Sequence, residues 1–139
     1  MLSKNLLATL PCSIRVLRKM FSEYLQDNMT QQHFRVLYLA NEGMGPTQMA
    51  ETMQISMAAV SKVVNCATLN SYLEKTTGKD RRSVILKLTP KGKKVLNSIS
   101  KRVEKRLDLV MRKLSPEEKE ELIQGIVVLD KLMHLMKEG

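Results

Sequence analysis

The chain has 139 residues, of which 43% are hydrophobic, and a formal charge of +9 at pH 7. This length and apolar content suit one globular domain and exclude a disordered basic tail. The sequence has two Phe, three Tyr and no Trp, which argues against a single-strand nucleic-acid binder that stacks bases on aromatic side chains.

Nothing in the sequence indicates a membrane or secreted protein. No apolar run reaches the roughly 18 residues of a spanning helix, and the first residues lack the pattern of a signal peptide. The two cysteines, Cys12 and Cys66, are too few for a disulfide framework and indicate a reducing compartment. We therefore expect a cytoplasmic protein.

The positive charge is concentrated in one stretch of the chain. Residues 75–94 carry eight basic side chains and one acidic side chain, whereas residues 114–139 carry three basic and six acidic ones. A local basic stretch of this kind indicates a site for a polyanion. A basic surface that serves only solubility is the alternative.

Two helices are predicted before residue 42. Apolar side chains from Leu6 to Tyr24 recur at steps of four and three, which is the spacing of one helical face. Pro11 lies inside this pattern, so the first helix either kinks there or is divided into two. Thr30 is a good N-cap for a second helix over residues 31–41.

Two further helices follow, joined by a short turn. Pro46 fits the first position of a helix over residues 46–53, and Ser56 fits the N-cap of one over residues 57–70. The spacing of apolar side chains predicts that this last helix buries Val60, Val63, Val64 and Ala67. Its opposite face carries Ala58, Ser61, Lys62 and Asn65.

A change of period then predicts a β-hairpin. Residues 72–77 and 83–88 are strand candidates, and in the second Val84, Leu86 and Leu88 alternate with Ser83, Ile85 and Lys87. The charged residues 78–82 form the predicted tip of this hairpin.

The chain closes with two long helices. Thr89 and Pro90 start the first, and Ser115 to Glu118 form a capping box that starts the second. Residues 122, 126, 129, 133 and 136 of the last helix form a heptad-like apolar seam, which neighbouring apolar residues widen. This band is broader than one neighbouring helix needs, so we expect a second subunit.

Two helices joined by a tight turn and followed by a charged hairpin are typical of a winged helix-turn-helix. Small side chains at Ala58 and Ser61 leave room for the helix in a major groove. There Asn65 can pair with adenine, and Lys62 with guanine or phosphate. Arg81 and Arg82 at the hairpin tip can reach the adjacent minor groove, where the potential is negative.

Helix N-termini at Thr30, Pro46 and Ser56 offer free amide groups to DNA phosphates. The basic residues Lys91, Lys93 and Lys94 are expected to attract DNA at long range.

Four sequence blocks in order make the chain similar to the MarR family of bacterial transcription regulators. They are Thr-Gln-Gln-His-Phe-Arg-Val-Leu (30–37), Met-Ala-Glu-Thr-Met-Gln-Ile-Ser (49–56), Val-Ser-Lys-Val-Val (60–64) and Asp-Arg-Arg-Ser (80–83). The last block continues into Leu-Thr-Pro-Lys-Gly (88–92). This last run resembles the family's wing signature and the start of its long dimerisation helix.

The resemblance implies a homodimer built from the first helix and the last two. It implies that Arg82 matches the family's minor-groove arginine and that Asp80 holds the wing arginine in place. It also places Ser56, Ala58, Ala59, Ser61, Lys62 and Asn65 at the recognition-helix contact positions.

The chain departs from the family pattern in three places. Gln54 stands in the helix turn where Gly is common. The stretch Cys66-Ala67-Thr68-Leu69-Asn70-Ser71-Tyr72 lacks the family's basic residue and leucine, and the Gly before the first wing strand. Only Thr76-Thr77-Gly78-Lys79 precede Asp80, so the wing is short.

Other reactive groups receive structural interpretations. A family branch senses peroxide with a first-helix cysteine, but Cys12 lies well inside the helix and is expected to be a packed, inert thiol. Cys66 is expected to be partly accessible, with oxidative regulation as the alternative. His33 and His134 have no metal-ligand spacing with either cysteine, so no metal site is expected.

Four methionines are expected to fill the core, with a plastic ligand pocket as the alternative: Met44, Met49, Met53 and Met57. No nucleophile–base pair or phosphate loop is visible, so no enzyme activity and no cofactor are expected beyond an unidentified small-molecule effector.

The predicted fold is mostly α with a small β-hairpin wing, in one domain over residues 1–139. Residues 29–94 form the winged DNA-binding lobe, and residues 1–28 and 95–139 the dimerisation helices. The candidate DNA contacts are Thr30, Gln32, Ser56, Ala58, Ala59, Ser61, Lys62, Asn65, Lys79, Asp80, Arg81 and Arg82.

The predicted function is a homodimeric, sequence-specific regulator, acting as a ligand-responsive repressor on a pseudo-palindromic site in double-stranded DNA. Two alternatives remain open at this point. The sparsely charged recognition face suits a sequence-tolerant architectural DNA binder, and the short wing suits a protein-interaction module on the same scaffold.

Overall fold

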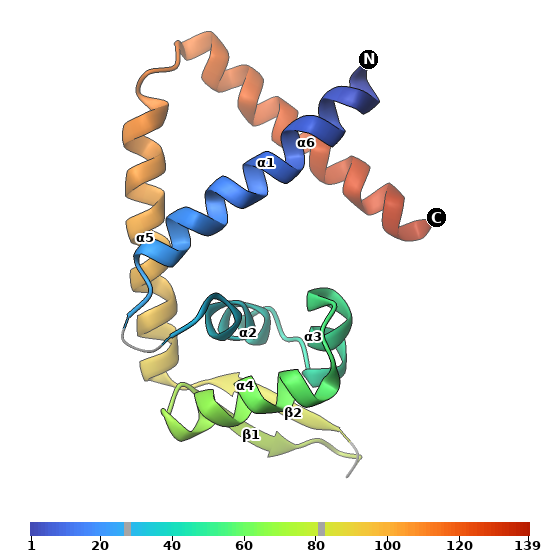
Figure 1. Ribbon diagram of the computed structural model, residues 1–139, viewed down its shortest axis with the longest axis vertical. Coiled ribbons are helices and arrows are strands. Elements are labelled where there is room, and N and C mark those ends of the chain that lie inside the picture. The colour runs from blue at the N-terminus through green and yellow to red at the C-terminus, as the bar shows by residue number, and fades with distance from the viewer. Residues whose placement is uncertain (27–28, 81–82) are drawn as a thin grey trace. The chain divides into compact units, whose positions relative to one another are not determined.

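A computed structural model of the protein describes residues 1–26, 29–80 and 83–139. Within these residues lie six helices and one antiparallel two-stranded sheet (Figure 1): α1 (Leu2–Glu23), α2 (Gln31–Asn41), α3 (Pro46–Met53), α4 (Met57–Leu69), β1 (Leu73–Thr77), β2 (Val84–Leu88), α5 (Pro90–Met111) and α6 (Pro116–Glu138). The predicted mostly α fold with a hairpin is confirmed. The chain divides into two compact units, residues 1–103 and 104–139.

The first helix is continuous. Of the two possibilities left open at Pro11, the structure shows one helix from Leu2 to Glu23 with the proline inside it. Its C-terminal end is anchored on α2, where the rings of Phe21 and Phe34 lie 5.0 Å apart between centroids. Among the described residues, no helix is both long enough and apolar enough to cross a membrane.

Hydrogen-bonded caps start α2 and α4 where the sequence predicts them. The Thr30 side chain accepts from the His33 amide at 3.2 Å, and the His33 ring accepts from the Thr30 amide at 3.0 Å. This is a capping box in which histidine takes the place of the usual Glu or Gln. Ser56 caps α4 by accepting from the Ala59 amide at 3.0 Å.

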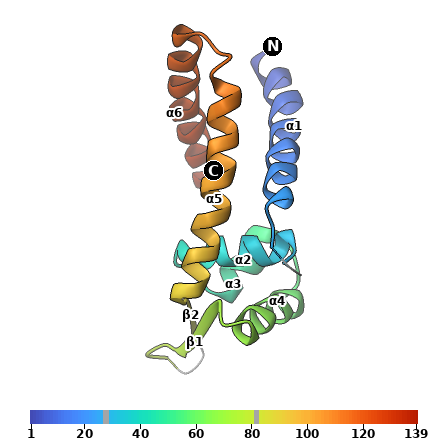
Figure 2. The same ribbon diagram turned by 90° about the vertical axis from the view of Figure 1, so that its left-hand side faces the viewer.

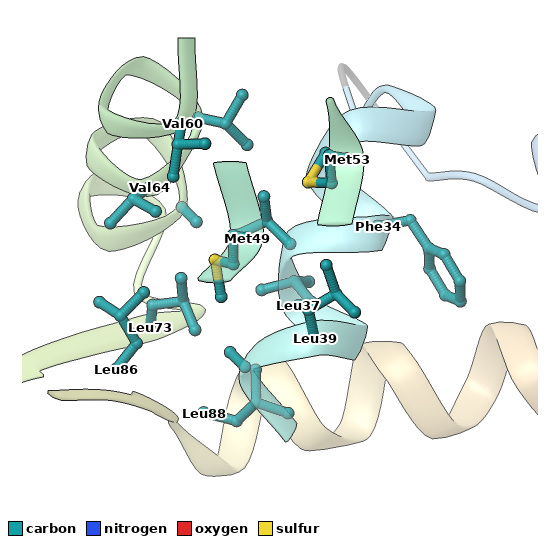
Figure 3. Packing of buried hydrophobic residues seen from close by; sticks show 14 of the residues in the cluster. Phe34, Leu37, Leu39, Met49, Met53, Val60, Val64, Leu73, Leu86 and Leu88 are labelled. Atoms are coloured by element: carbon teal, nitrogen blue, oxygen red, sulfur yellow. The ribbon is translucent and has the colours of Figure 1, made fainter. Parts of the chain in front are cut away.

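One apolar core holds the helices and the hairpin of residues 1–103 together. The predicted buried face of α4 is confirmed, since Val60, Val63, Val64 and Ala67 are all buried. Figure 3 shows Met49 of α3 between the α4 valines and the leucines of α2. Burying side chains of this size contributes roughly 1.5–3 kcal/mol each, so α4 is fixed with one face inward.

The hairpin joins this core at one end only. Strand β1 pairs with β2 from Leu73 opposite Leu88 to Thr77 opposite Val84. Leu73, Leu86 and Leu88 are buried, but Val84 is 42% exposed, so the predicted alternation fails at this residue. The reason is its position, because Val84 lies near the tip, beyond the reach of the core.

The start of α5 packs closely against the segment that joins α4 to β1. The Thr89 amide donates to the Tyr72 carbonyl at 3.1 Å, and the Thr89 hydroxyl accepts from the Gly92 amide at 3.0 Å. A Cβ atom on Gly92 would lie 2.2 Å from the Tyr72 carbonyl oxygen. Only glycine permits this approach, so Gly92 sets how the hairpin meets α5.

Among the residues that the structure describes, two that are not glycine have a left-handed backbone. Gln54 ends α3 with φ of 55°, and Ser71 precedes the hairpin with φ of 63°. These are the turn and pre-strand positions where the MarR pattern favours glycine. A left-handed conformation costs an ordinary residue roughly 1–2 kcal/mol, so these two positions lower stability.

The second unit contains the end of α5 and all of α6. The predicted capping box is confirmed, with Ser115 and Glu118 each accepting from the other's amide at 3.1 Å. Every residue of α6 is described and none is buried. Its apolar side chains therefore lie open in the single chain, with Ile126 57% and Val128 65% exposed.

Replacing Gly92 by alanine is predicted to destabilise the protein by about 1–3 kcal/mol, because the new methyl group collides with a backbone carbonyl. Gly125 of α6 is the matched control, since its added Cβ meets no described atom within 4 Å. Gly125→Ala should stabilise by up to about 1 kcal/mol through helix propensity. Urea unfolding measures both, and equal stability of the two variants would contradict the close approach.

Candidate nucleic-acid interface

The outer face of α4 carries the predicted contact residues. Ala58, Ser61, Lys62 and Asn65 are all exposed, and Ala59 is half-buried at the edge of this face. Because the valines opposite them are in the core, these side chains can only face solvent or a ligand. The exposed face is narrow, small and weakly charged, which suits insertion into a DNA groove.

The hairpin lies beside α4 and adds a cation to its outer face. Figures 1 and 2 show α4 and the hairpin together at the end of this unit away from α1, and α4 contacts β1. Lys75 is directly opposite Leu86 in the strand register, so both side chains are on the face of the sheet that packs on the core. There the Lys75 ammonium donates to the Asn65 side-chain oxygen.

Lys75 was not among the predicted contacts. The signal was present, since Lys75 is two residues after the buried Leu73 and the period of a strand places both on one side. The basic run alone did not distinguish it from its neighbours, and the contact to Asn65 depends on tertiary packing.

The predicted phosphate contacts lie at the N-terminal ends of α2, α3 and α4. Ser56 is at the N-terminus of α4. Thr30 and Gln32 are exposed in the first turn of α2, next to His33, which lines a pocket of about 350 Å³ together with Asn70 beyond the C-terminal end of α4. A helix of this length extends about 20 Å, so the structure separates Ser56 from Thr30 along the candidate interface.

The wing is closed by backbone hydrogen bonds. The Gly78 amide donates to the Ser83 carbonyl at 2.9 Å, and the Ser83 amide donates to the Asp80 carbonyl at 2.9 Å. Lys79 and Asp80 are exposed. Arg81 and Arg82 lie outside the described residues, so their predicted minor-groove contacts, and the role of Asp80 in holding an arginine, stay predictions.

Lys91 has a structural contact that the sequence did not indicate. Its ammonium donates to the Asn70 carbonyl at 3.0 Å and lies 5.0 Å from the centre of the Tyr72 ring. This side chain therefore connects the start of α5 with the end of α4, in addition to its predicted contribution to the positive potential.

Two predictions about sulfur-containing residues are wrong. Cys12 is exposed instead of packed, because nothing in the described chain covers this part of α1. Met57 is 47% exposed, because it is the first residue of α4 and precedes the buried face. Met49 and Met53 are buried and Cys66 is half-buried, as predicted. In the described residues no three His, Cys, Asp or Glu side chains are grouped as metal ligands.

A second candidate site lies between α1 and α2. A pocket of about 380 Å³ is lined by Arg18, Phe21, Leu25, Gln31, Phe34, Arg35, Tyr38 and Leu39. Both charged residues in this lining are arginines. Burial, together with the charge of Arg18, lowers the pKa of Arg35 below its ordinary value. Two arginines in an apolar, aromatic pocket favour an anionic apolar ligand.

Comparisons with known proteins were positive for a curated relative and for solved structures. No model of a protein family matches the sequence. Among curated proteins, the chain is similar to an uncharacterized HTH-type transcriptional regulator, YfiV of Bacillus subtilis (strain 168), with 25% identity over 120 residues that cover 84% of this chain and 75% of that protein.

Solved structures share the fold. A MarR family protein from Bacillus stearothermophilus superimposes with a TM-score of 0.81 at 18% identity and covers 95% of each chain. A mutant of MepR from Staphylococcus aureus bound to an oligodeoxyribonucleotide gives a TM-score of 0.64 at 15% identity, over 89% of this chain and 94% of that one. The resemblance to the MarR family is therefore confirmed at the level of the winged-helix fold.

Proposed function

We propose that this protein is a transcription regulator that binds double-stranded DNA sequence-specifically as a homodimer. The observation that carries the proposal is the outer face of α4, where small and polar side chains lie beside a basic hairpin on a helix whose other face is fixed in the core. Such a helix can enter a major groove without rearrangement of the lobe.

The relatives support this proposal. YfiV is named as a transcriptional regulator, and the MepR variant was solved with an oligodeoxyribonucleotide. A dimer with twofold symmetry reads a pseudo-palindromic site whose half-site centres are about 10 bp apart. In the cytoplasm, a dimer bound to such a site would block RNA polymerase, which favours a role as a repressor. This role requires no catalysis by the protein.

The exposed side of α6 supports the homodimer. Monomeric proteins rarely expose large apolar patches, and α6 exposes seven large apolar side chains: Leu122, Ile123, Ile126, Val127, Val128, Leu135 and Met136. A second copy of the chain, joined through a self-complementary contact, would bury them.

The pocket between α1 and α2 supports a response to a small molecule. An anionic apolar effector would satisfy Arg18 and Arg35 and bring both helices under the influence of the ligand. Such a ligand changes DNA binding only if it has different affinities for the two forms of the dimer.

One observation favours a second function, an architectural DNA binder without strict base preference. Of the residues that form the exposed face of α4, all of them described, only Lys62 is charged. Binding in that case depends on phosphates and is equal for all sequences.

The first test is fluorescence anisotropy with the DNA upstream of the protein's own gene and with a scrambled duplex of equal length. We expect nanomolar binding to the first alone. Arg82→Ala should weaken binding and reduce the slope of log K against log salt by about one unit, because one phosphate-region cation is lost.

Lys101→Ala on the exposed part of α5 is the control for lost charge, and its slope should stay unchanged. Equal binding of both duplexes would favour the architectural function. Binding of neither duplex would contradict both and leave the protein-interaction module.

The homodimer is tested with one added charge at two positions of α6. Ile126→Lys should convert the dimer to a monomer in analytical ultracentrifugation, because it buries an ammonium in an apolar contact. Gln124→Lys adds the same charge about half a turn away, outside the apolar seam, and should remain dimeric. Two dimeric variants would place the contact elsewhere.

The effector pocket is tested with benzoate, a small aromatic anion. We expect benzoate to lower the affinity of the wild-type protein for upstream DNA, and Arg35→Gln to respond much less because a carboxylate partner is lost. Benzyl alcohol, which has the same ring and no charge, should have little effect. An equal response to both compounds would exclude recognition of an anion.

A further inference from the structure

We infer that Lys75 sets the base specificity of Asn65, so that the two side chains together read guanine and not adenine. The inference rests on the proposed function, since it concerns the bases that α4 selects in duplex DNA. It assigns a specificity role to a strand residue outside the recognition helix.

The fold places Lys75 at the recognition helix by strand geometry. Leu73 is buried, and Lys75 follows it on the same side of β1. Its strand partner Leu86 is buried too, so this side of the hairpin packs toward α4. Along this side of β1, Leu73 is buried and Lys75 is the first exposed residue. Its ammonium contacts Asn65.

The chemistry of the contact fixes the Asn65 amide. An ammonium has three donors and no acceptor, so its partner on the amide must be the oxygen and not the nitrogen. The amide NH₂ group therefore stays available. The orientation follows from donor and acceptor types and does not depend on telling oxygen from nitrogen by position.

Adenine and guanine make different demands on this pair. Bidentate pairing of an asparagine with adenine requires the amide oxygen to accept from N6 while the NH₂ group donates to N7. Lys75 takes one of the two lone pairs of that oxygen and holds a donor-only ammonium beside it, so adenine N6, which is also a donor, would meet a second donor there. Guanine presents two acceptors, O6 and N7, in the major groove, and the Asn65 NH₂ group and the Lys75 ammonium are two donors side by side.

Hairpin charge alone would not give this result. Lys87 is directly opposite Glu74 on the other face of the same two strands, at the same distance along the hairpin to within one residue. It has the same charge as Lys75 but faces away from α4. Lys87 therefore contributes to attraction and not to the choice of base, which makes it a matched control.

The test is selection of bound duplexes from a library with randomised half-sites, followed by sequencing, for the wild-type protein and three variants. Asn65→Ala identifies the base position that depends on Asn65. We expect guanine there for the wild type. Lys75→Met removes the ammonium that opposes the adenine N6 donor, so preference should shift toward adenine by roughly tenfold. Lys87→Met should keep guanine.

The outcomes separate the inference from the function on which it rests. Adenine at the Asn65-dependent position in the wild type would overturn the inference and leave the regulator intact. The same holds if Lys75→Met lowers binding to all sequences equally and retains guanine. If the wild-type protein selects no sequence at all, the specific regulator and the inference are both overturned. Thermal melting of each variant confirms that the fold is retained.

Discussion

The candidate interface depends on the burial of one face of α4. Val60, Val63 and Val64 pack against α2 and α3, and this contact fixes the rotation of the helix about its axis. The period of 3.6 residues then determines which side chains remain outside. Ser61, Lys62 and Asn65 are available to DNA because the valines next to them in sequence are not. A polar substitution among the valines would therefore affect recognition as well as stability, since the helix could no longer keep one orientation.

The second constraint is the junction of α4, β1 and α5. Ser71 takes a left-handed conformation, Thr89 bonds to the Tyr72 carbonyl, and Gly92 approaches that carbonyl more closely than any side chain would allow. The hairpin starts and ends at this junction, so its direction relative to α4 is set there. The contact of Lys75 with Asn65 follows from that direction. Gln54 and Ser71, where the sequence departs from the family pattern, both have a left-handed backbone that glycine would adopt at lower cost.

Local signals predicted the elements, and tertiary contacts decided the details of the site. The caps at Thr30, Ser56 and Ser115 and the apolar period of α4 are encoded within a few residues, so the limits of α2 and α3 and the buried valines could be predicted from the sequence. Exposure of Met57 and Val84 could not, because each lies just beyond the edge of a packed face, and exposure of Cys12 could not, because nothing described covers its part of α1. Lys75 and the arginine pocket were missed for another reason. Their partners are far away in sequence, and no short pattern records which strand residue meets which helix residue.

The proposed function requires a face with few charges to select a sequence, and the arrangement of its donors offers a way. Asn65 of α4 and Lys75 of β1 are in contact, and Lys62 is exposed about one turn from Asn65, so the donor groups come from two elements. Small side chains at Ala58 and Ser61 add little energy but let the helix backbone approach the bases. Affinity can then come from the basic hairpin through phosphates, which is independent of sequence. Selectivity can come from the few donors that the fold holds in place. Such a donor loses little conformational entropy when it meets its acceptor. It pays the full desolvation penalty when the acceptor is absent.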